Sequence, residues 1–186
     1  MGRELFDTIV IGAGPVGSHA AQLLAGCGFN VAVFEEHERI GEPMQCTGII
    51  GVECFERFQL STESVLREAR SAKLFSPSGK MMRLHSEKPQ AYIVDRGAFD
   101  RMLADSAASR GARYFTSSKV AGIEIAHDRV KISTDIGETF ESRTAIIASG
   151  FYSKLARKLG LEKYRDFITG AQAEVTIKEG SKLEEI

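Results

Sequence analysis

A glycine-rich turn near the N-terminus carries the strongest chemical signal in the sequence. Gly12, Gly14 and Gly17 have the spacing G-x-G-x-x-G, between an apolar run over residues 6–11 and a helical pattern that begins at Pro15. Glycine at these positions permits a tight turn, close approach of a pyrophosphate to the backbone, and close packing of the helix on a sheet. The first turn of the helix adds unpaired N–H groups and a partial positive charge. The predicted pyrophosphate site consists of Gly12, Ala13, Gly14, Pro15 and Val16.

The second chemical signal is an acidic residue at the end of the next apolar run. Residues 31–34 are typical of a buried strand, and Glu35 follows them at the separation from Gly12 that a dinucleotide-binding βαβ unit requires. Its carboxylate can accept hydrogen bonds from both hydroxyls of an adenosine ribose. It would repel a 2′-phosphate, which disfavours NADP here. FAD and NAD are both compatible with the pattern, because both contain ADP. A glycine-rich turn in another type of α/β protein is the alternative interpretation.

Glu36 is counted with the candidate cofactor-binding residues. It opens a charged segment with Glu38 and Arg39, and a solvated loop explains these three side chains more simply. The four histidines have neither metal-binding nor catalytic-triad spacing, so we expect them in loops or in solvent. No metal site is predicted.

The elements around these residues predict an α/β fold with a parallel sheet. The first helix should bury the face that carries Val16, Ala20, Leu23 and Leu24. A β-meander over residues 119–143 is expected just before the last parallel strand. The predicted parallel strands are 6–11, 31–34, 112–115 and 144–148, and the predicted helices are 15–26, 96–110 and 153–159.

The remaining segments predict antiparallel structure. Residues 71–95 read as antiparallel strands with a turn at residues 76–79, where proline and glycine lie near the centre. A helical stretch is expected near residues 51–69. Residues 167–177 alternate between apolar and polar side chains, as in a strand with one buried face.

Composition excludes several classes of protein. The 186 residues are 43% hydrophobic and 26% charged, with a net charge of −1, which is typical of a globular protein. No basic stripe suggests nucleic-acid binding. Cys27, Cys46 and Cys54 form no C-x-x-C pair, so a disulfide framework is not expected and a reducing compartment is favoured. No apolar run reaches the roughly 18 residues of a membrane span. We therefore expect a cytoplasmic protein.

The long antiparallel excursion and the meander resemble the FAD-binding domain shared by glutathione reductase and p-hydroxybenzoate hydroxylase. Within that superfamily the chain resembles the geranylgeranyl reductase family of flavoproteins, from about residue 5 to residue 177. The segments that carry the resemblance are Gly12–Gly17, Gly41–Gly48 with its Gly-x-Pro-x-x-Cys pattern, Tyr92–Arg96 with Phe99 and Asp100, and Gly170–Gln172.

The resemblance implies FAD as the cofactor and a role for each matching residue. Cys46 to Gly48 would lie beside the isoalloxazine ring, and Arg96 would contact FAD at the start of its helix. Val120 matches a meander residue whose backbone meets the adenine. Gly150 matches a second motif, usually Asp-Gly, in which this chain has Ser149. That replacement removes a negative charge and puts recognition of a nicotinamide donor there in doubt.

The family's reaction is hydride transfer from reduced FAD to an isolated C=C bond of a polyprenyl lipid or pigment chain. Cys46 is the candidate proton donor, and a small buried hydrophobic residue is the alternative interpretation. The donor to FAD could be NADPH, NADH or ferredoxin. Peripheral membrane contact would give access to the lipid substrate.

Two rival functions share these features. One is a flavin-dependent aromatic monooxygenase, and the other is an inactive nucleotide-binding fragment. Family members are considerably longer, so we expect a fragment that self-associates through the exposed strand 167–177. The implied architecture is a Rossmann-like FAD-binding domain, with a parallel sheet and a β-meander, plus part of an antiparallel substrate-domain sheet. The expected domains are 1–70 with 96–160, and 71–95 with 165–186.

Overall fold

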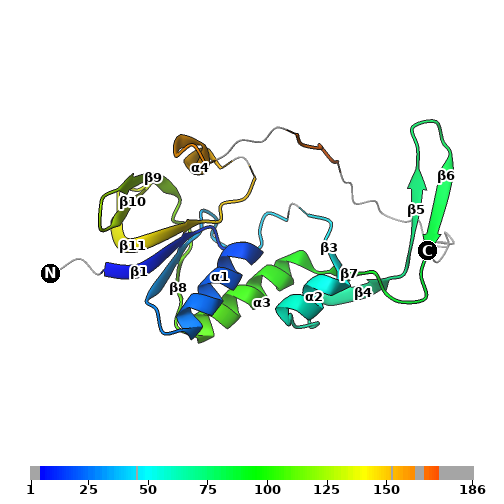
Figure 1. Cartoon of the computed structure of the whole chain (residues 1–186), viewed down its shortest axis with the longest axis horizontal. Coiled ribbons are helices and arrows are strands. Elements are labelled where there is room, and N and C mark those ends of the chain that lie inside the picture. Colours follow the sequence, from blue (N-terminus) through cyan, green and yellow to red (C-terminus); the bar gives the residue numbers. More distant parts are fainter. Residues whose placement is uncertain (1–4, 45, 152, 162–165, 172–186) are drawn as a thin grey trace. The chain divides into compact units, whose positions relative to one another are not determined.

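The computed structural model describes residues 5–44, 46–151, 153–161 and 166–171 (Figure 1). The chain divides into two compact units. The first consists of Met1–Gln45 and Gly97–Arg165, and the second of Cys46–Arg96 and Asp166–Ile186.

The first unit is built on a six-stranded sheet with the order β8-β2-β1-β11-β10-β9. The first four strands in this order are parallel, and β10 and β9 continue the sheet as an antiparallel meander. The predicted Rossmann-like fold with a β-meander is thereby confirmed. The strands are β1 (Leu5–Ile11), β2 (Val31–Phe34), β8 (Arg113–Phe115), β9 (Val120–Ile125), β10 (Val130–Thr134) and β11 (Thr139–Ile147).

β11 differs from the prediction in one respect. The third meander strand and the last parallel strand, predicted as separate, are one strand of nine residues. The first part of β11 pairs with β10, where Phe140 lies opposite Ile132. Residues Glu141 to Ile147 of β11 pair with β1. No glycine or proline interrupts residues 139–147, so nothing breaks the extended backbone.

Two layers cover the faces of this sheet. Helices α1 (Pro15–Gly26) and α3 (Arg96–Ser109) lie on one face (Figure 1), where Gln22 donates a hydrogen bond to Ser106 over 2.8 Å. The other face holds an aromatic cluster, in which the rings of Phe34 and Phe115 stack 4.8 Å apart. A short helix, α4 (Lys154–Lys158), buries Leu155 in the same cluster.

The buried face of α1 is the predicted one only in part, since Leu24 packs against the core as expected. The helix buries small residues, namely Gly17, Ser18, Ala21 and Ala25, whereas Val16 and Leu23 are 73% and 53% exposed. A Cβ atom on Gly17 would overlap the carbonyl oxygen of Gly12. Gly12 itself has φ +106°, and a Cβ there would lie 2.5 Å from the Ala148 oxygen. Small residues therefore bring α1 close to β1 and to the end of β11.

The second unit holds two small antiparallel sheets. Strands β3 (Ile49–Gly51), β7 (Ala91–Val94) and β4 (Val65–Ala69) form one in the order β3-β7-β4. Strands β5 (Ser71–Phe75) and β6 (Met81–His85) form a hairpin, as predicted for residues 71–95. Its turn is closed by a hydrogen bond from the Ser76 amide to the Lys80 carbonyl over 2.9 Å.

The predicted helix over residues 51–69 is too long. Helix α2 (Val52–Phe58) ends at Gln59, which has φ 50°, and Val65–Ala69 instead pair with β7 as β4. The strand predicted over residues 167–177 lies largely outside the described residues, and residues 166–171 are all exposed. Within the described residues, no helix has the length and apolar character needed to cross a membrane.

The close packing of Gly17 yields a stability prediction. Gly17→Ala forces a methyl group onto the Gly12 carbonyl, and we expect it to lower the free energy of unfolding by about 3 kcal/mol. Chemical unfolding followed by circular dichroism measures the change.

Gly26→Ala is the matched control in the same helix. Its Cβ would meet only the Arg110 side chain, at 3.4 Å, so the variant should gain up to about 1 kcal/mol from helix propensity. Equal stabilities of the two variants would contradict the packing described for α1.

Candidate functional site

The N-terminus of α1 is open to a ligand. Gly14 is the N-cap, no side chain caps the helix, and its first turn contains no acidic residue. The Ser18 amide makes the first helical hydrogen bond to the Gly14 carbonyl, at 2.9 Å. A Cβ on Gly14 would meet no atom within 4 Å. Amides with partial positive charge thus border open space, as an anion site requires.

The carboxylate of Glu35 lies directly beside this turn. Its Oε2 accepts a hydrogen bond from the Ala13 amide over 2.9 Å. Its Oε1 accepts one from the His37 amide over 3.0 Å and lies 2.6 Å from His37 Nδ1. The Glu35 side chain is 13% exposed, so the carboxylate is largely buried but reachable. The structure therefore brings together two of the predicted elements, the glycine turn and the acidic end of β2.

The connection between β8 and β9 holds the segment that carries Glu35. The Ser118 amide donates to the Glu35 carbonyl over 2.8 Å, and the Ser117 amide donates to the His37 carbonyl over 3.0 Å. Lys119 forms an ion pair with Glu36. The hydrogen bond from Lys119 lowers the pKa of Glu36 below its ordinary value and raises the pKa of Lys119. The Glu36 carboxylate is thus already paired with a side chain of the protein.

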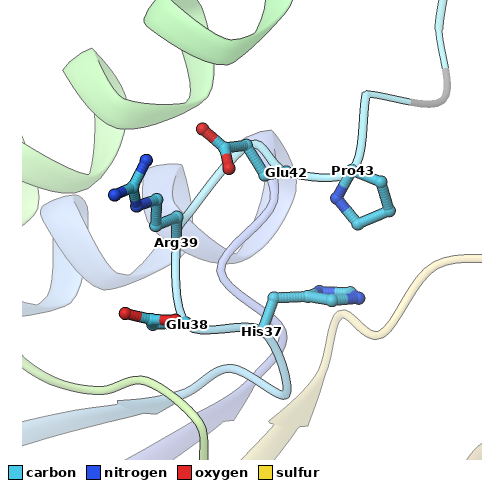
Figure 2. A pocket seen from close by; sticks show the side chains of 5 residues that line it. All are labelled: His37, Glu38, Arg39, Glu42 and Pro43. Atoms are coloured by element: carbon cyan, nitrogen blue, oxygen red, sulfur yellow. The ribbon is translucent and has the colours of Figure 1, made fainter.

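A hollow of about 430 Å³ follows this segment, lined by His37, Glu38, Arg39, Glu42 and Pro43. Figure 2 shows the His37 ring on the Pro43 side of the loop, with Glu38 and Arg39 extending to the other side. The lining is mostly charged, and His37 belongs to both the hollow and the Glu35 contact.

Two predicted residues flank the site elsewhere in the first unit. Val120 begins β9 next to Lys119 and packs partly buried against the aromatic cluster. Gly150 follows β11, and a Cβ there would meet no atom within 4 Å. Ser149 makes a 2.6 Å hydrogen bond to Ser153, which caps α4, so the residue that replaces the acidic one of the motif links β11 to α4.

Three predicted residues belong to the second unit. Cys46 is half-buried. Gly48 has φ +73°, and a Cβ there would overlap the Val94 carbonyl oxygen, while the Val94 amide donates to the Gly48 carbonyl over 2.8 Å. Packing of the 46–48 segment against β7 therefore requires glycine at position 48. Arg96 is the first residue of α3 and is partly buried.

The sequence patterns do not single out His37, Ser117 or Lys119. His37 has no motif and is expected in a loop, and residues 117 and 119 lie more than 80 positions from Glu35. Among the sequence patterns, only the position of Glu36 in the predicted charged loop, next to β2, indicates that this segment takes part in the site. The contacts appear once β8 is paired with β2.

Comparison with known proteins assigns the chain to a family. A model described as FAD dependent oxidoreductase matches residues 55–175, and one described as NAD(P)-binding Rossmann-like domain matches residues 10–48. The first match covers more than half of the chain. The chain belongs to the FAD-dependent oxidoreductases. FAD is therefore the cofactor of its family, as predicted.

Relatives agree with the resemblance to geranylgeranyl reductases. The chain is 31% identical over 168 residues to a digeranylgeranylglycerophospholipid reductase of Methanosarcina mazei, a match that covers 86% of this chain and 41% of the relative. A geranylgeranyl bacteriochlorophyll reductase-like protein of Thermoplasma acidophilum is 30% identical, with a TM-score of 0.75, over 87% of this chain and 43% of that one. The chain thus spans less than half the length of these relatives.

A third similarity concerns the fold alone. The p-nitrophenol 4-monooxygenase of Pseudomonas putida has a TM-score of 0.72 over 86% of this chain and 44% of its own, at 16% identity. The aromatic monooxygenase alternative shares this architecture and has no further support in the described residues.

The residues present fit the ADP half of FAD. The open space at Gly14 and the uncapped amides of α1 suit a pyrophosphate. The reachable Glu35 carboxylate suits a ribose.

The ion pair of Glu36 yields a pH prediction. Lys119→Gln removes the charged donor and its charge-assisted hydrogen bond, so the pKa of Glu36 should rise toward its ordinary value of 4.5, as measured by NMR titration. Lys131→Gln, which breaks a 3.8 Å pair with Glu124 on the same sheet, is the control and should leave Glu36 unchanged.

The sign of the effect on stability follows from the direction of the shift. A lowered pKa means that the ion pair stabilises the fold at neutral pH, and that this contribution is lost as the pH falls through the folded-state pKa of Glu36. Because both side chains are about half exposed, at 47% and 57%, the loss in Lys119→Gln should stay below about 1 kcal/mol. A Glu36 pKa that is the same in both variants would contradict the pairing.

Proposed function

We propose that this chain binds FAD and belongs to an enzyme that reduces C=C bonds of a polyprenyl lipid or pigment chain. The observation that carries the proposal is the contact between the Ala13 amide and the Glu35 carboxylate, at 2.9 Å. It joins an anion site to a ribose acceptor, which are the two parts needed for ADP. The names of the relatives support the substrate class.

The first unit would hold the ADP half of FAD. The amides at the start of α1 would bind the pyrophosphate, where the helix dipole adds to the attraction. Glu35 would accept a hydrogen bond from a ribose hydroxyl at the position that remains on Oε2. Val120 would meet the adenine through its backbone, Arg96 and Gly150 would contact other parts of FAD, and Glu36 would act by fixing the segment beside Glu35.

Bound FAD would supply the hydride chemistry of the reaction. A C=C bond that accepts a hydride also needs a proton on its second carbon, and Cys46 is the side chain that would hold this proton. Its half-buried thiol lies two residues before Gly48, whose backbone is anchored on β7. That anchor would keep the position of the thiol constant through the reaction.

Substrate access and electron supply complete the proposal. A polyprenyl chain partitions into membranes, so the enzyme would work as a cytoplasmic protein in peripheral contact with one. NADPH, NADH and ferredoxin are the candidate donors, and the neutral Ser149 gives no support to the two nicotinamide donors.

The open space at Gly14 yields a binding prediction. Gly14→Ala places a methyl group where the pyrophosphate would approach, and we expect FAD affinity to fall at least tenfold, measured by quenching of flavin fluorescence. Because the Cβ meets no protein atom, the fold should persist.

Gly51→Ala is the matched control. Gly51 is the N-cap of α2, again without a side-chain cap and with open space at its Cβ, so it incurs the same loss of N-cap preference. Its FAD affinity should equal that of the unmodified chain. If Gly14→Ala and Gly51→Ala bind FAD with equal affinity, the pyrophosphate does not bind at the N-terminus of α1.

The proton-donor role of Cys46 yields a second prediction. Cys46→Ser replaces the thiol by a much weaker acid, and single-turnover reduction of a polyprenyl lipid by pre-reduced enzyme should slow about 100-fold. FAD affinity should not change. The measurement uses an enzyme with the full length of the relatives.

Cys54→Ser serves as the control, because Cys54 is the other half-buried cysteine of the second unit. Its reaction should proceed at the original rate. If Cys46→Ser keeps the original rate as well, Cys46 is a packing residue.

A further inference from the structure

The carboxylate of Glu35 is restrained at both of its oxygens. The Ala13 amide binds Oε2, and the amide and Nδ1 of His37 approach Oε1 at 3.0 and 2.6 Å. An ionised carboxylate can only accept, so Nδ1 carries the proton of the shorter contact. Rotation of the carboxylate about its last torsion would break contacts at both ends.

Backbone hydrogen bonds also fix the position of His37. Its carbonyl accepts a hydrogen bond from the Ser117 amide over 3.0 Å, and the Glu35 carbonyl accepts one from the Ser118 amide over 2.8 Å. The residue between them, Glu36, is paired with Lys119. The backbone on both sides of His37 is therefore anchored to the β8–β9 connection, which limits the positions available to the imidazole.

We propose that His37 is a positioning residue that sets the preference of this site for a ribose with free hydroxyls. The inference rests on the proposed function, in which Glu35 binds the ribose. Oε1 already accepts two hydrogen bonds from His37, whereas Oε2 accepts one, from Ala13. The position left for a ribose hydroxyl is therefore on Oε2, and its direction depends on the plane of the carboxylate. By donating to Oε1 opposite the Ala13 amide, His37 maintains that plane.

The preference for a ribose with free hydroxyls can be measured as a ratio of two affinities, which a general loss of structure does not change. ADP and 2′-deoxy-ADP share the adenine and pyrophosphate and differ by one hydroxyl. The ratio of their affinities therefore isolates the ribose contact, because any damage to the rest of the site weakens both ligands equally. A hydrogen bond to a carboxylate should make this ratio at least tenfold in the unmodified chain.

The experiment compares three variants of the full chain by isothermal titration calorimetry with both nucleotides. Glu35→Gln should reduce the ratio nearly to one. His37→Leu removes the side-chain donor, keeps the backbone amide, and should lower the ratio about fivefold. His37→Asn places an amide N–H close to the position of Nδ1 and should keep the ratio within twofold of the original.

The outcomes separate the two proposals. If the unmodified chain does not distinguish the nucleotides, or if Glu35→Gln keeps the ratio, Glu35 does not bind the ribose and both proposals fail. If Glu35→Gln lowers the ratio but His37→Leu does not, the ribose assignment stands and His37 has no positioning role. If His37→Asn lowers the affinity ratio as much as His37→Leu does, hydrogen bonding by the His37 side chain does not set the ratio, and the inference is wrong.

Discussion

The candidate site depends on one close backbone contact, between Gly17 in the first turn of α1 and the carbonyl of Gly12. Nothing larger than hydrogen fits at Gly17, and Gly12 in turn lies against Ala148 at the end of β11. The helix can approach the sheet this closely because its buried face consists of small residues. That short distance places the free amides of α1 at the same sheet edge as Glu35. A bulkier interface would separate the phosphate and ribose parts of the site.

Local patterns were enough to predict the parallel core. Short apolar runs followed by glycine or acidic residues define β1, β2 and the start of α1, because their causes lie within a few residues. The prediction of the buried face of α1 was wrong at Val16 and Leu23 for a physical reason. Large apolar residues usually mark a buried face, but close packing here selects Ala21 and Ala25. Likewise, α2 ends at a glutamine with positive φ, a position that the residue type does not reveal.

The environment of Glu35 could be predicted only in part. Its place after β2 follows from spacing, and its contact with Ala13 follows from the geometry of the βαβ unit. The contributions of Ser117, Ser118 and Lys119 depend on the pairing of β8 with β2, which joins segments about 80 residues apart. Charged and small polar residues in such connections have no periodicity, so their partners emerge only from the assembled sheet.

The β5–β6 hairpin has a practical consequence through its two adjacent methionines. Successive strand residues point to opposite faces, so Met82 lies with Leu74 on one face and Met81 with Phe75 on the other. Both are 54% exposed. Thioethers are oxidised to sulfoxides when reagents can reach them, and each sulfoxide adds one oxygen to the peptide mass. Mild peroxide treatment would therefore report on the two faces of the hairpin separately. The methionine that is protected from oxidation identifies the face that another surface covers.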